Sequence, residues 1–189
     1  MSDGYYKTEA SVKEYIKLAK DVDGTELIEK LKQFLPLNSS LLEIGSGPGN
    51  DWEILKTCYK IVGSDNSKEF INHLASKFPN GKFLNLDAVS LKTNLKFDGI
   101  YTNKIMHHLT DEELIKSIEK QSGILNANGI ICHSFWKGEG SEIFKGLFVN
   151  YHEKQDIVKF YTHNFEILVL DFYTEFDKDD SILIIGKKK

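Results

Sequence analysis

The sequence contains little of what builds disulfide scaffolds, cysteine-rich metal sites or membrane spans. Its 189 residues include two cysteines, Cys58 and Cys132, and neither has a partner at metal or redox spacing. No apolar stretch approaches the ~20 residues that a transmembrane helix needs. The segment Met1–Glu9 is polar and lacks the apolar core of a signal peptide. We therefore expect a cytoplasmic protein with reduced cysteines, without a bound metal and without a membrane segment.

An excess of positive charge is also absent. Lys and Arg total 24 and Asp and Glu total 28, which gives a formal net charge of −4. A mildly acidic protein has no general attraction to nucleic acid or to anionic membranes. The one basic run, Lys187–Lys189, ends the sequence and is expected to be a solvated tail. These features favour a small-molecule partner over nucleic acid.

What the sequence does contain is a regular alternation of short apolar runs with segments of helical spacing. Strands that alternate with helices predict a parallel sheet with right-handed crossovers. The predicted strands are Ser40–Gly45, Lys60–Asp65, Lys82–Asp87, Phe97–Asn103, Gly129–Trp136, Phe165–Phe176 and Ser181–Gly186. The predicted helices are Ser11–Lys20, Thr25–Leu35, Glu53–Tyr59, Ser67–Phe78 and Asp111–Leu125.

Three local features refine this outline. Only Asp177–Asp180 separates the last two strands, which is too short for a helical crossover, so they are expected to form an antiparallel hairpin. Asn128-Gly129 is expected to end the helix that begins at Asp111. The helix over Ser11–Lys20 could lie over a ligand cleft and close it with Tyr5, Tyr6 and Tyr15.

A glycine-rich turn follows the first strand. The segment from Glu43 to Gly49 places glycines at 45, 47 and 49, where the backbone can approach a ligand closely. A dinucleotide site would need its third glycine at position 50, which is Asn50. Glu43 would repel a pyrophosphate but suits a ligand with a cationic end. The pattern favours a positively charged, phosphate-free ligand, whose space a side chain at Gly45 is expected to fill.

Polar residues end the next strands, at the edge of the sheet where ligands of doubly wound folds bind. Asp65 lies 20 residues after Gly45, the usual distance for an acid that accepts both ribose hydroxyls. Asp87, followed by Ala88, could accept a hydrogen bond from an adenine amino group. The alternative for each acid is a helix cap or a turn residue.

Together these segments resemble the class I S-adenosylmethionine-dependent methyltransferases. The resemblance rests on the following matches: Glu43–Gly49 to the first motif, Asp65 to the acid that ends the second strand, Asp87-Ala88 to the adenine-contacting pair, Phe97–Leu109 to the fourth strand and its loop, and Leu125–Ile131 to the approach to the fifth strand. In the last of these, Ala127 and Asn128 replace the usual Pro and Gly.

The resemblance implies a Rossmann-like α/β fold. Its seven-stranded sheet would have the order 3-2-1-4-5-7-6, with strand 7 antiparallel and helices on both faces. One methyltransferase domain is expected over 1–189, with a helical cap segment over 1–35 and the Rossmann-like core over 36–189. The implied cofactor is S-adenosyl-L-methionine. The residues expected to contact it are Glu43, Gly45, Ser46, Gly47, Gly49, Asp51, Asp65, Asn66, Asp87, Ala88, Asn103 and Lys104.

Methyl transfer from a sulfonium needs mainly alignment and desolvation, because the carbon is already activated. If a base takes part, His107 or His108 is the best candidate, because both follow the fourth strand and histidine accepts protons near neutral pH. The alternative is that one histidine packs structurally and the other caps the helix starting near Asp111. The segment 103–106 departs from the (D/N)-P-P-(Y/F) pattern, which weakens base amines and Gln or Asn side chains as acceptors.

The expected function is therefore methyl transfer to a small molecule, by a monomer or homodimer. Three alternatives remain at this point: a methyltransferase acting on protein or RNA, a non-catalytic S-adenosylmethionine-binding protein, and a nucleotide-dependent oxidoreductase. The loop that Trp136 opens, residues 137–140, could gate the acceptor. His73, His152 and His163 are expected on the surface.

Overall fold

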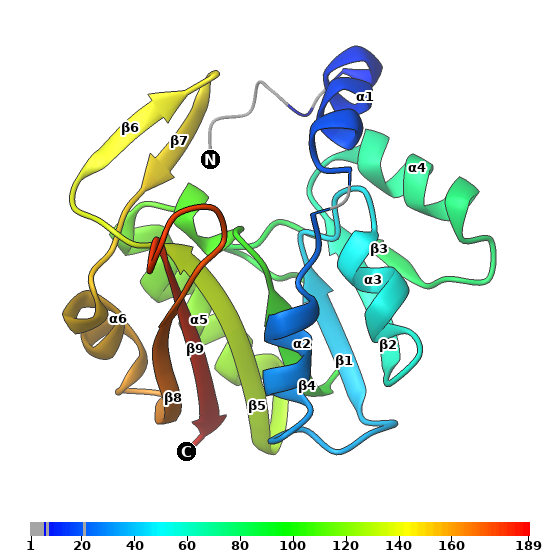
Figure 1. Cartoon of the computed structure of the whole chain (residues 1–189). Coiled ribbons are helices and arrows are strands. Elements are labelled where there is room, and N and C mark those ends of the chain that lie inside the picture. The colour runs from blue at the N-terminus through cyan, green and yellow to red at the C-terminus, as the bar shows by residue number, and fades with distance from the viewer. Residues whose placement is uncertain (1–5, 7, 21) are drawn as a thin grey trace.

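A computed structural model describes residue 6, residues 8–20 and residues 22–189 (Figure 1). Tyr5 lies outside these residues. The architecture is one seven-stranded sheet of order β3-β2-β1-β4-β5-β9-β8, as the resemblance implied, together with a separate two-stranded ribbon. The strands of the large sheet are β1 (Ser40–Ile44), β2 (Lys60–Asp65), β3 (Phe83–Asn85), β4 (Phe97–Thr102), β5 (Leu125–Trp136), β8 (Phe165–Tyr173) and β9 (Ser181–Lys188).

The first five strands run parallel. β1 is central and pairs with β2 on one side and with β4 on the other. Their carboxyl ends, near Ile44, Asp65 and Thr102, therefore meet at one edge of the sheet. This is the edge at which open α/β sheets bind ligands.

The last strand runs antiparallel to both of its neighbours. β9 pairs with β5 from Ile130 opposite Lys187 to Trp136 opposite Ser181, and it pairs with β8 on its other side. The short connection after β8 leaves no room for a crossover helix, so the hairpin prediction is confirmed. The loop between β8 and β9 lies at the same edge as the carboxyl ends of the parallel strands (Figure 1).

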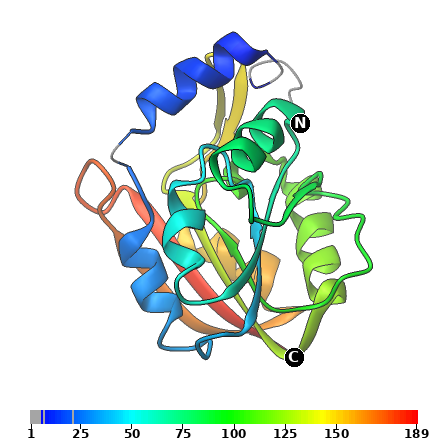
Figure 2. The same ribbon diagram turned by 90° about the vertical axis from the view of Figure 1, so that its right-hand side faces the viewer.

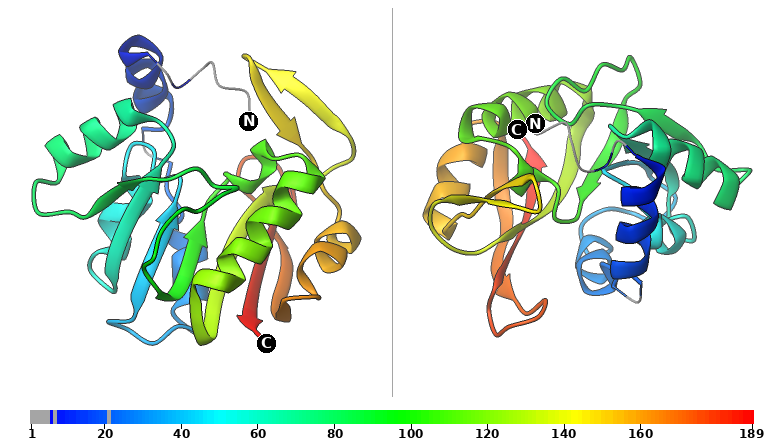
Figure 3. Two further views of the ribbon diagram at one scale, coloured as in Figure 1. Left: turned by 180° about the vertical axis from the view of Figure 1, so that it is seen from behind. Right: turned by 90° about the horizontal axis from the view of Figure 1, so that it is seen from above.

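Helices cover both faces of the sheet (Figures 1 and 3). The helices α2 (Thr25–Leu31), α3 (Asn50–Leu55) and α4 (Lys68–Lys77) contribute to one core cluster. The helices α5 (Asp111–Ile124) and α6 (Lys154–Tyr161) contribute to a second cluster on the other face. Alternation along the strands divides the sheet between the two, because Leu41 joins the first cluster and Leu42 the second.

Two elements cap the ligand-binding edge. Helix α1 (Glu9–Leu18) lies beyond the carboxyl ends of the strands and contacts α4 (Figure 2). The ribbon of β6 (Ser141–Phe144) and β7 (Leu147–Asn150) stands on the other side of this edge, and β7 packs against the short 3-10 helix η2 (Met106–His108) (Figure 1). No described helix is long and apolar enough to cross a bilayer.

The sequence-based outline was wrong in two places. Helix α5 ends at Ile124 and β5 begins at once at Leu125, so Asn128-Gly129 does not end the helix. Instead, Leu125 already pairs with Phe97, and the pairing shifts before Gly99 opposite Ile130. Asn128 takes up this irregularity with a positive φ of 60°.

The second error was the missing β6, β7 and α6. All of β6 is exposed, so it lacks the half-apolar pattern that indicates a strand. Helix α6 did offer a signal, because Glu153 and Asp156 form a capping box at its start.

Candidate functional site

The glycine turn after β1 has the backbone geometry that only glycine adopts readily. Gly45, Gly47 and Gly49 have φ values of 76°, 48° and 81°. The amides of Gly45 and Ser46 both donate to the Ser64 carbonyl at 2.8 Å, which fixes the turn to β2. The chain then enters α3, so the turn joins a strand to a helix as expected.

The three glycines differ in the atoms that surround them. A β-carbon on Gly45 would lie 2.4 Å from Ile105 Cδ1, and one on Gly49 would lie 2.7 Å from Leu74 Cδ2. A β-carbon on Gly47 would meet only the Gly45 carbonyl oxygen, at 4.0 Å. The expectation that a side chain at Gly45 fills the ligand space is therefore wrong, because Ile105 already occupies that position. Gly47 is the glycine that faces open space.

Glu43 is buried beneath this turn and accepts a hydrogen bond from Ser46 Oγ at 2.5 Å. Burial, together with the nearby carboxylates of Asp51 and Asp65, raises the pKa of Glu43 to about 8. A buried carboxyl group among other carboxylates is stabilised in its charged form by a cation. The turn is therefore suited to a positively charged ligand.

Asp65 ends β2 beside the turn. Its Oδ2 accepts from the Gly47 amide at 3.0 Å and its Oδ1 accepts from the Ser67 amide at 2.8 Å. Burial raises its pKa to about 6 despite these bonds. Asn66, the next residue, is exposed at the same edge. Asp65 thus combines a link to the glycine turn with lone pairs that remain available to hydroxyl groups of a ligand.

Asp87 follows β3 and behaves locally as a turn residue. Its Oδ1 accepts from the amides of Val89 and Ser90, at 3.2 and 2.8 Å. Ala88 is buried, and its carbonyl accepts from Ser117 Oγ at 2.6 Å. The structure therefore places this pair at the ligand-binding edge, and Asp87 also fulfils the structural role that the sequence left open.

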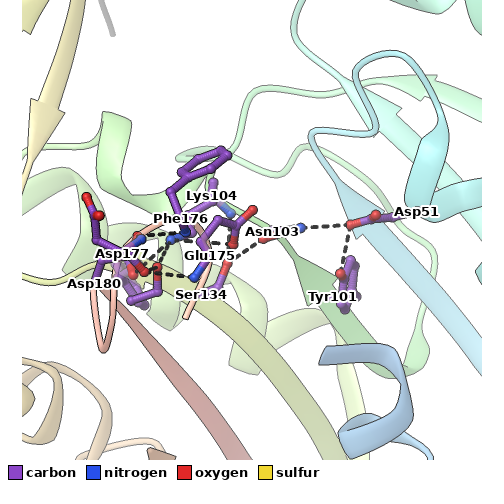
Figure 4. A network of polar contacts seen from close by, with 11 residues as sticks. Asp51, Tyr101, Asn103, Lys104, Ser134, Glu175, Phe176, Asp177 and Asp180 are labelled. Carbon is purple, nitrogen blue, oxygen red and sulfur yellow. Dashed lines mark hydrogen bonds and ion pairs between the residues drawn. The ribbon is translucent and has the colours of Figure 1, made fainter. Parts of the chain in front are cut away.

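Asp51 begins a chain of polar contacts that crosses the edge of the sheet (Figure 4). Its Oδ2 accepts from Tyr101 Oη at 2.7 Å and from Asn103 Nδ2 at 3.1 Å, while Oδ1 accepts from the Gly24 amide at 2.6 Å. Asn103 Oδ1 in turn accepts from Ser134 Oγ at 2.7 Å. The residues at the ends of β4 and β5 are thus tied to the helix that follows the glycine turn.

Lys104 occupies the other end of this chain, with a positive φ of 53°. Its Nζ donates to Ser181 Oγ at 2.5 Å and lies 3.2 Å from the centre of the Trp136 ring. Burial lowers its pKa to about 7, which the Glu175 carboxylate, 3.9 Å away, partly opposes. Lys104 therefore points toward β9 and the β8–β9 loop, away from the glycine turn.

The two candidate histidines lie next to each other in η2, with ring centres 4.0 Å apart. His107 is buried, its pKa lies well below the usual range because of burial, and its Nδ1 has no hydrogen-bond partner in the described part of the chain. His108 Nδ1 lies 2.8 Å from the Phe148 carbonyl of β7. Since a carbonyl only accepts, Nδ1 carries the proton and Nε2 carries the lone pair.

The structure also brings residues to the site that the sequence did not single out. Gly24 and Glu175 come from segments distant in sequence, and Ser134 is one polar residue in a buried strand, so neither spacing nor composition marks them. The expectation for His152 was wrong: it is buried and lies 3.3 Å from Asp111 Oδ1.

Helix α1 is positioned to cover the site. Burial raises the pKa of Tyr15, and the carboxylates of Asp65, Asp51 and Glu175 contribute to the rise. Tyr15 also packs against Tyr6 and Phe70, with ring centres 5.2 and 6.0 Å away. Tyr15 therefore lies among acids on both sides of the edge. Within the described residues, no group of three His, Cys, Asp or Glu side chains is arranged to hold a metal ion.

Comparisons with known proteins show what this geometry is similar to. Residues 41–129 match the family model of a methyltransferase domain, which spans the glycine turn, Asp65, Asp87 and both candidate histidines. This segment holds the ligand-binding edge described above, apart from the β8–β9 loop and the N-terminal helices.

Solved structures share the fold at low sequence identity. An S-adenosylmethionine-dependent methyltransferase from Methanosarcina mazei is 16% identical, with a TM-score of 0.76, over 84% of this chain and 96% of that one. The N-methyltransferase NodS from Bradyrhizobium japonicum, in complex with S-adenosylhomocysteine, is 14% identical with a TM-score of 0.70, over 87% and 84%.

A third similar structure is the 1,6-didemethyltoxoflavin-N1-methyltransferase of Burkholderia thailandensis. It is 15% identical with a TM-score of 0.70, over 87% of this chain and 76% of that one. The matched domain, the strand order and the glycine turn agree with one another. Residues 41–129 match a methyltransferase domain, and the chain shares its fold with solved S-adenosylmethionine-dependent methyltransferases.

Proposed function

We propose that this protein transfers a methyl group from S-adenosylmethionine to a small-molecule acceptor. The observation that carries the proposal is the group of buried carboxyls at the glycine turn, Glu43, Asp51 and Asp65, each with a pKa raised by burial. Such a group binds a ligand with a sulfonium and an ammonium and disfavours one with a pyrophosphate. This argues against a nucleotide-dependent oxidoreductase.

The donor contacts follow from the positions of these residues. Asp65 would accept hydrogen bonds from the ribose hydroxyls, with Asn66 beside it, and Asp87 and Ala88 would flank the adenine. Glu43, Ser46, Asp51 and the open side of Gly47 would face the methionine end, with Gly45 and Gly49 shaping the turn. Asn103 would support that end through Asp51. Lys104 would serve the acceptor side, because its Nζ points toward β9.

When bound, the donor supplies an activated methyl group, so the chain itself has to align the acceptor and exclude water. Tyr15 of α1 and the β6–β7 ribbon flank the site and would restrict solvent access. If the acceptor must lose a proton, His108 is the better placed of the two histidines. Burial lowers the pKa of both histidines, but further in His107, and the Nε2 of His108 carries a lone pair.

A small acceptor is supported by size and by similar proteins. The described residues form one seven-stranded sheet and a short two-stranded ribbon with no appended recognition module, and the formal net charge is −4. We therefore also propose that residues 1–189 act as a single domain. One similar protein is crystallised with 1,6-didemethyltoxoflavin, a small molecule, and another is described as a glycopeptide N-methyltransferase.

Calorimetry with Asp65→Asn tests the donor site. The substitution keeps the size of the side chain but removes the charge and half of the acceptors, so donor affinity should fall by ~1–3 kcal/mol. Asp98→Asn is a matched control, because Asp98 lies at the opposite end of β4. Unchanged affinity in Asp65→Asn would refute the ribose assignment. Methyl transfer to a panel of small acceptors, lost in His108→Gln but with donor binding retained, would support the assigned base.

A further inference from the structure

A cavity of about 310 Å³ opens beside the polar chain of Figure 4, between the start of α2 and the β8–β9 loop. Its size falls at the lower end of the range for pockets that hold small molecules. Gly24 belongs to its wall and also donates to Asp51, so the cavity adjoins the proposed donor site. Besides Gly24, the wall includes Asp23, Glu26, Tyr173, Glu175 and Phe176.

Glu175 is the buried charge of this wall, with a side chain only 12% exposed. Its nearest cation, Lys104 Nζ, is 3.9 Å away, which is too far for a hydrogen bond. Lys104 directs its own N–H groups elsewhere, to Ser181 Oγ at 2.5 Å and to the Phe135 carbonyl at 3.3 Å. Burial raises the pKa of Glu175, although Lys104 and a hydrogen bond from Tyr173 partly oppose the rise. A carboxylate has about four acceptor sites, so Glu175 can still accept from a ligand.

Aromatic surface surrounds this carboxylate. Phe176 is 69% exposed and stacks on Trp136, with ring centres 5.9 Å apart. The buried hydroxyl of Tyr173 lies beside the Glu175 carboxylate as a hydrogen-bonding neighbour, so the Tyr173 ring adjoins this charge. An ammonium group is attracted both to a carboxylate and to the faces of aromatic rings, whereas a carboxylate ligand is attracted to neither.

The charge of the cavity wall also favours an ammonium group over a carboxylate. Asp23, Glu26 and Glu175 contribute three carboxylates, and the cavity wall contains no Lys or Arg. An anionic acceptor would be repelled here, and a neutral alcohol would add no positive charge to that of Lys104, 3.9 Å from Glu175. A primary or secondary amine satisfies the carboxylate through its N–H groups and places its carbon skeleton against Tyr173 and Phe176.

We infer that Glu175 is a specificity-determining residue that selects an amine as the methyl acceptor, bound in the cavity between α2 and the β8–β9 loop. This inference rests on the proposed methyl transfer and names the acceptor class for it. It assigns Lys104 the role of a positioning residue, because Lys104 pairs with Glu175 and contacts Trp136, on which the wall residue Phe176 stacks.

The test uses three probes of one size: benzylamine, benzyl alcohol and benzoate. Each is titrated into the protein with and without saturating S-adenosylhomocysteine, and binding is followed through the amide NMR signals of Gly24 and Phe176. Benzylamine should shift these signals and bind at least ~10-fold more tightly than benzyl alcohol. Equal binding of the three probes, a preference for benzoate, or no shift with benzylamine would overturn the inference.

Variants then assign the selectivity to one side chain. Glu175→Gln should reduce benzylamine affinity to that of benzyl alcohol, and Glu175→Asp should retain part of the preference. Glu166→Gln, at an exposed position of the same strand β8, should leave it unchanged. An unaltered amine preference in Glu175→Gln would refute the assignment. Calorimetry with S-adenosylhomocysteine separately reports whether the donor site itself is correct, so the two proposals fail independently.

Discussion

Gly47 is the residue whose missing side chain matters most for the donor. Gly47→Ala should weaken donor binding strongly, because the β-carbon enters open space at the turn, while the positive φ adds a folding cost of ~1–2 kcal/mol. Gly146→Ala is a matched control, since Gly146 has a φ of 80° and open space around it in the β6–β7 turn. Donor affinity measured by calorimetry separates the loss of binding from the folding cost. An equal loss of affinity in both variants would contradict the proposal that the turn at Gly47 contacts the donor.

The acidity of Glu43 makes donor binding depend on pH. Its pKa near 8 means that the carboxyl is largely protonated at neutral pH, and a cationic donor favours the ionised form. Affinity should therefore rise as pH increases up to about 8 and level off above it, with a proton released on binding below that pH. In Glu43→Gln this rise should disappear. Only the pH dependence of affinity that comes from Asp65, whose pKa is about 6, should remain. A flat profile in the wild type would exclude the coupling.

For individual residues, the sequence predicted the positions of the acids but not their hydrogen-bond partners. Glu43, Asp65 and the glycines could be identified from their spacing on a strand and its turn. The bond from Gly24 to Asp51 joins residues 27 positions apart through the packing of α2, and no local pattern encodes it. The position of Ile105 against Gly45 likewise depends on how the loop after β4 folds back.

At the scale of elements, Asn50 ties the segment after α1 to the helix that follows the glycine turn. Its Nδ2 donates to the carbonyls of Ala19 and Val22, at 2.8 and 2.9 Å. Asn50→Ala should release this segment, increase amide hydrogen exchange in α1, and lower donor affinity by ~1–2 kcal/mol. Asn126→Ala removes a comparable bond to Asp98 at the far end of the sheet and should leave α1 unaffected. Unchanged exchange in Asn50→Ala would show that α1 is held by other contacts.

Element prediction succeeded where burial imposed a pattern. The seven strands of the main sheet follow from apolar runs of strand length, because parallel strands are buried on both faces. The β6–β7 ribbon contradicts that rule, since Ile143 and Phe144 are exposed, 65% and 56%, while Ser141 and Glu142 are polar. Such a ribbon is set by its turn and by contacts with η2, and neither is visible as periodicity.

For the whole molecule, buried neutral histidines make the free energy of unfolding depend on pH. Burial lowers the pKa of His133 to about 3, so between pH 6.5 and 3 the unfolded state binds the extra proton and stability falls as pH falls. Between roughly pH 6.5 and pH 5, the free energy of unfolding of the wild type should fall by about 2 kcal/mol relative to that of His133→Gln. Glu43 and Asp65 act in the opposite sense, and the comparison between variants cancels them. Urea unfolding measures the difference, and His163→Gln, at an exposed site, should show none.

Strand order was the most predictable property of the whole molecule. The family resemblance implied the order, and the four-residue gap Asp177–Asp180 between the last two predicted strands independently required one reversal. A helix over the ligand edge was predicted, but the β6–β7 ribbon was not, because its contacts with η2 join elements distant in sequence.

The buried acids below the glycine turn also link the stability of the protein to the concentration of its donor. Glu43, Asp51 and Asp65 cost folding free energy when no cation faces them, as their raised pKa values indicate. A bound donor offsets that cost by mass action, so the melting temperature should climb with donor concentration. In a cell starved of methionine the same chain would unfold more often and be degraded sooner, so that its abundance would follow the supply of methyl groups.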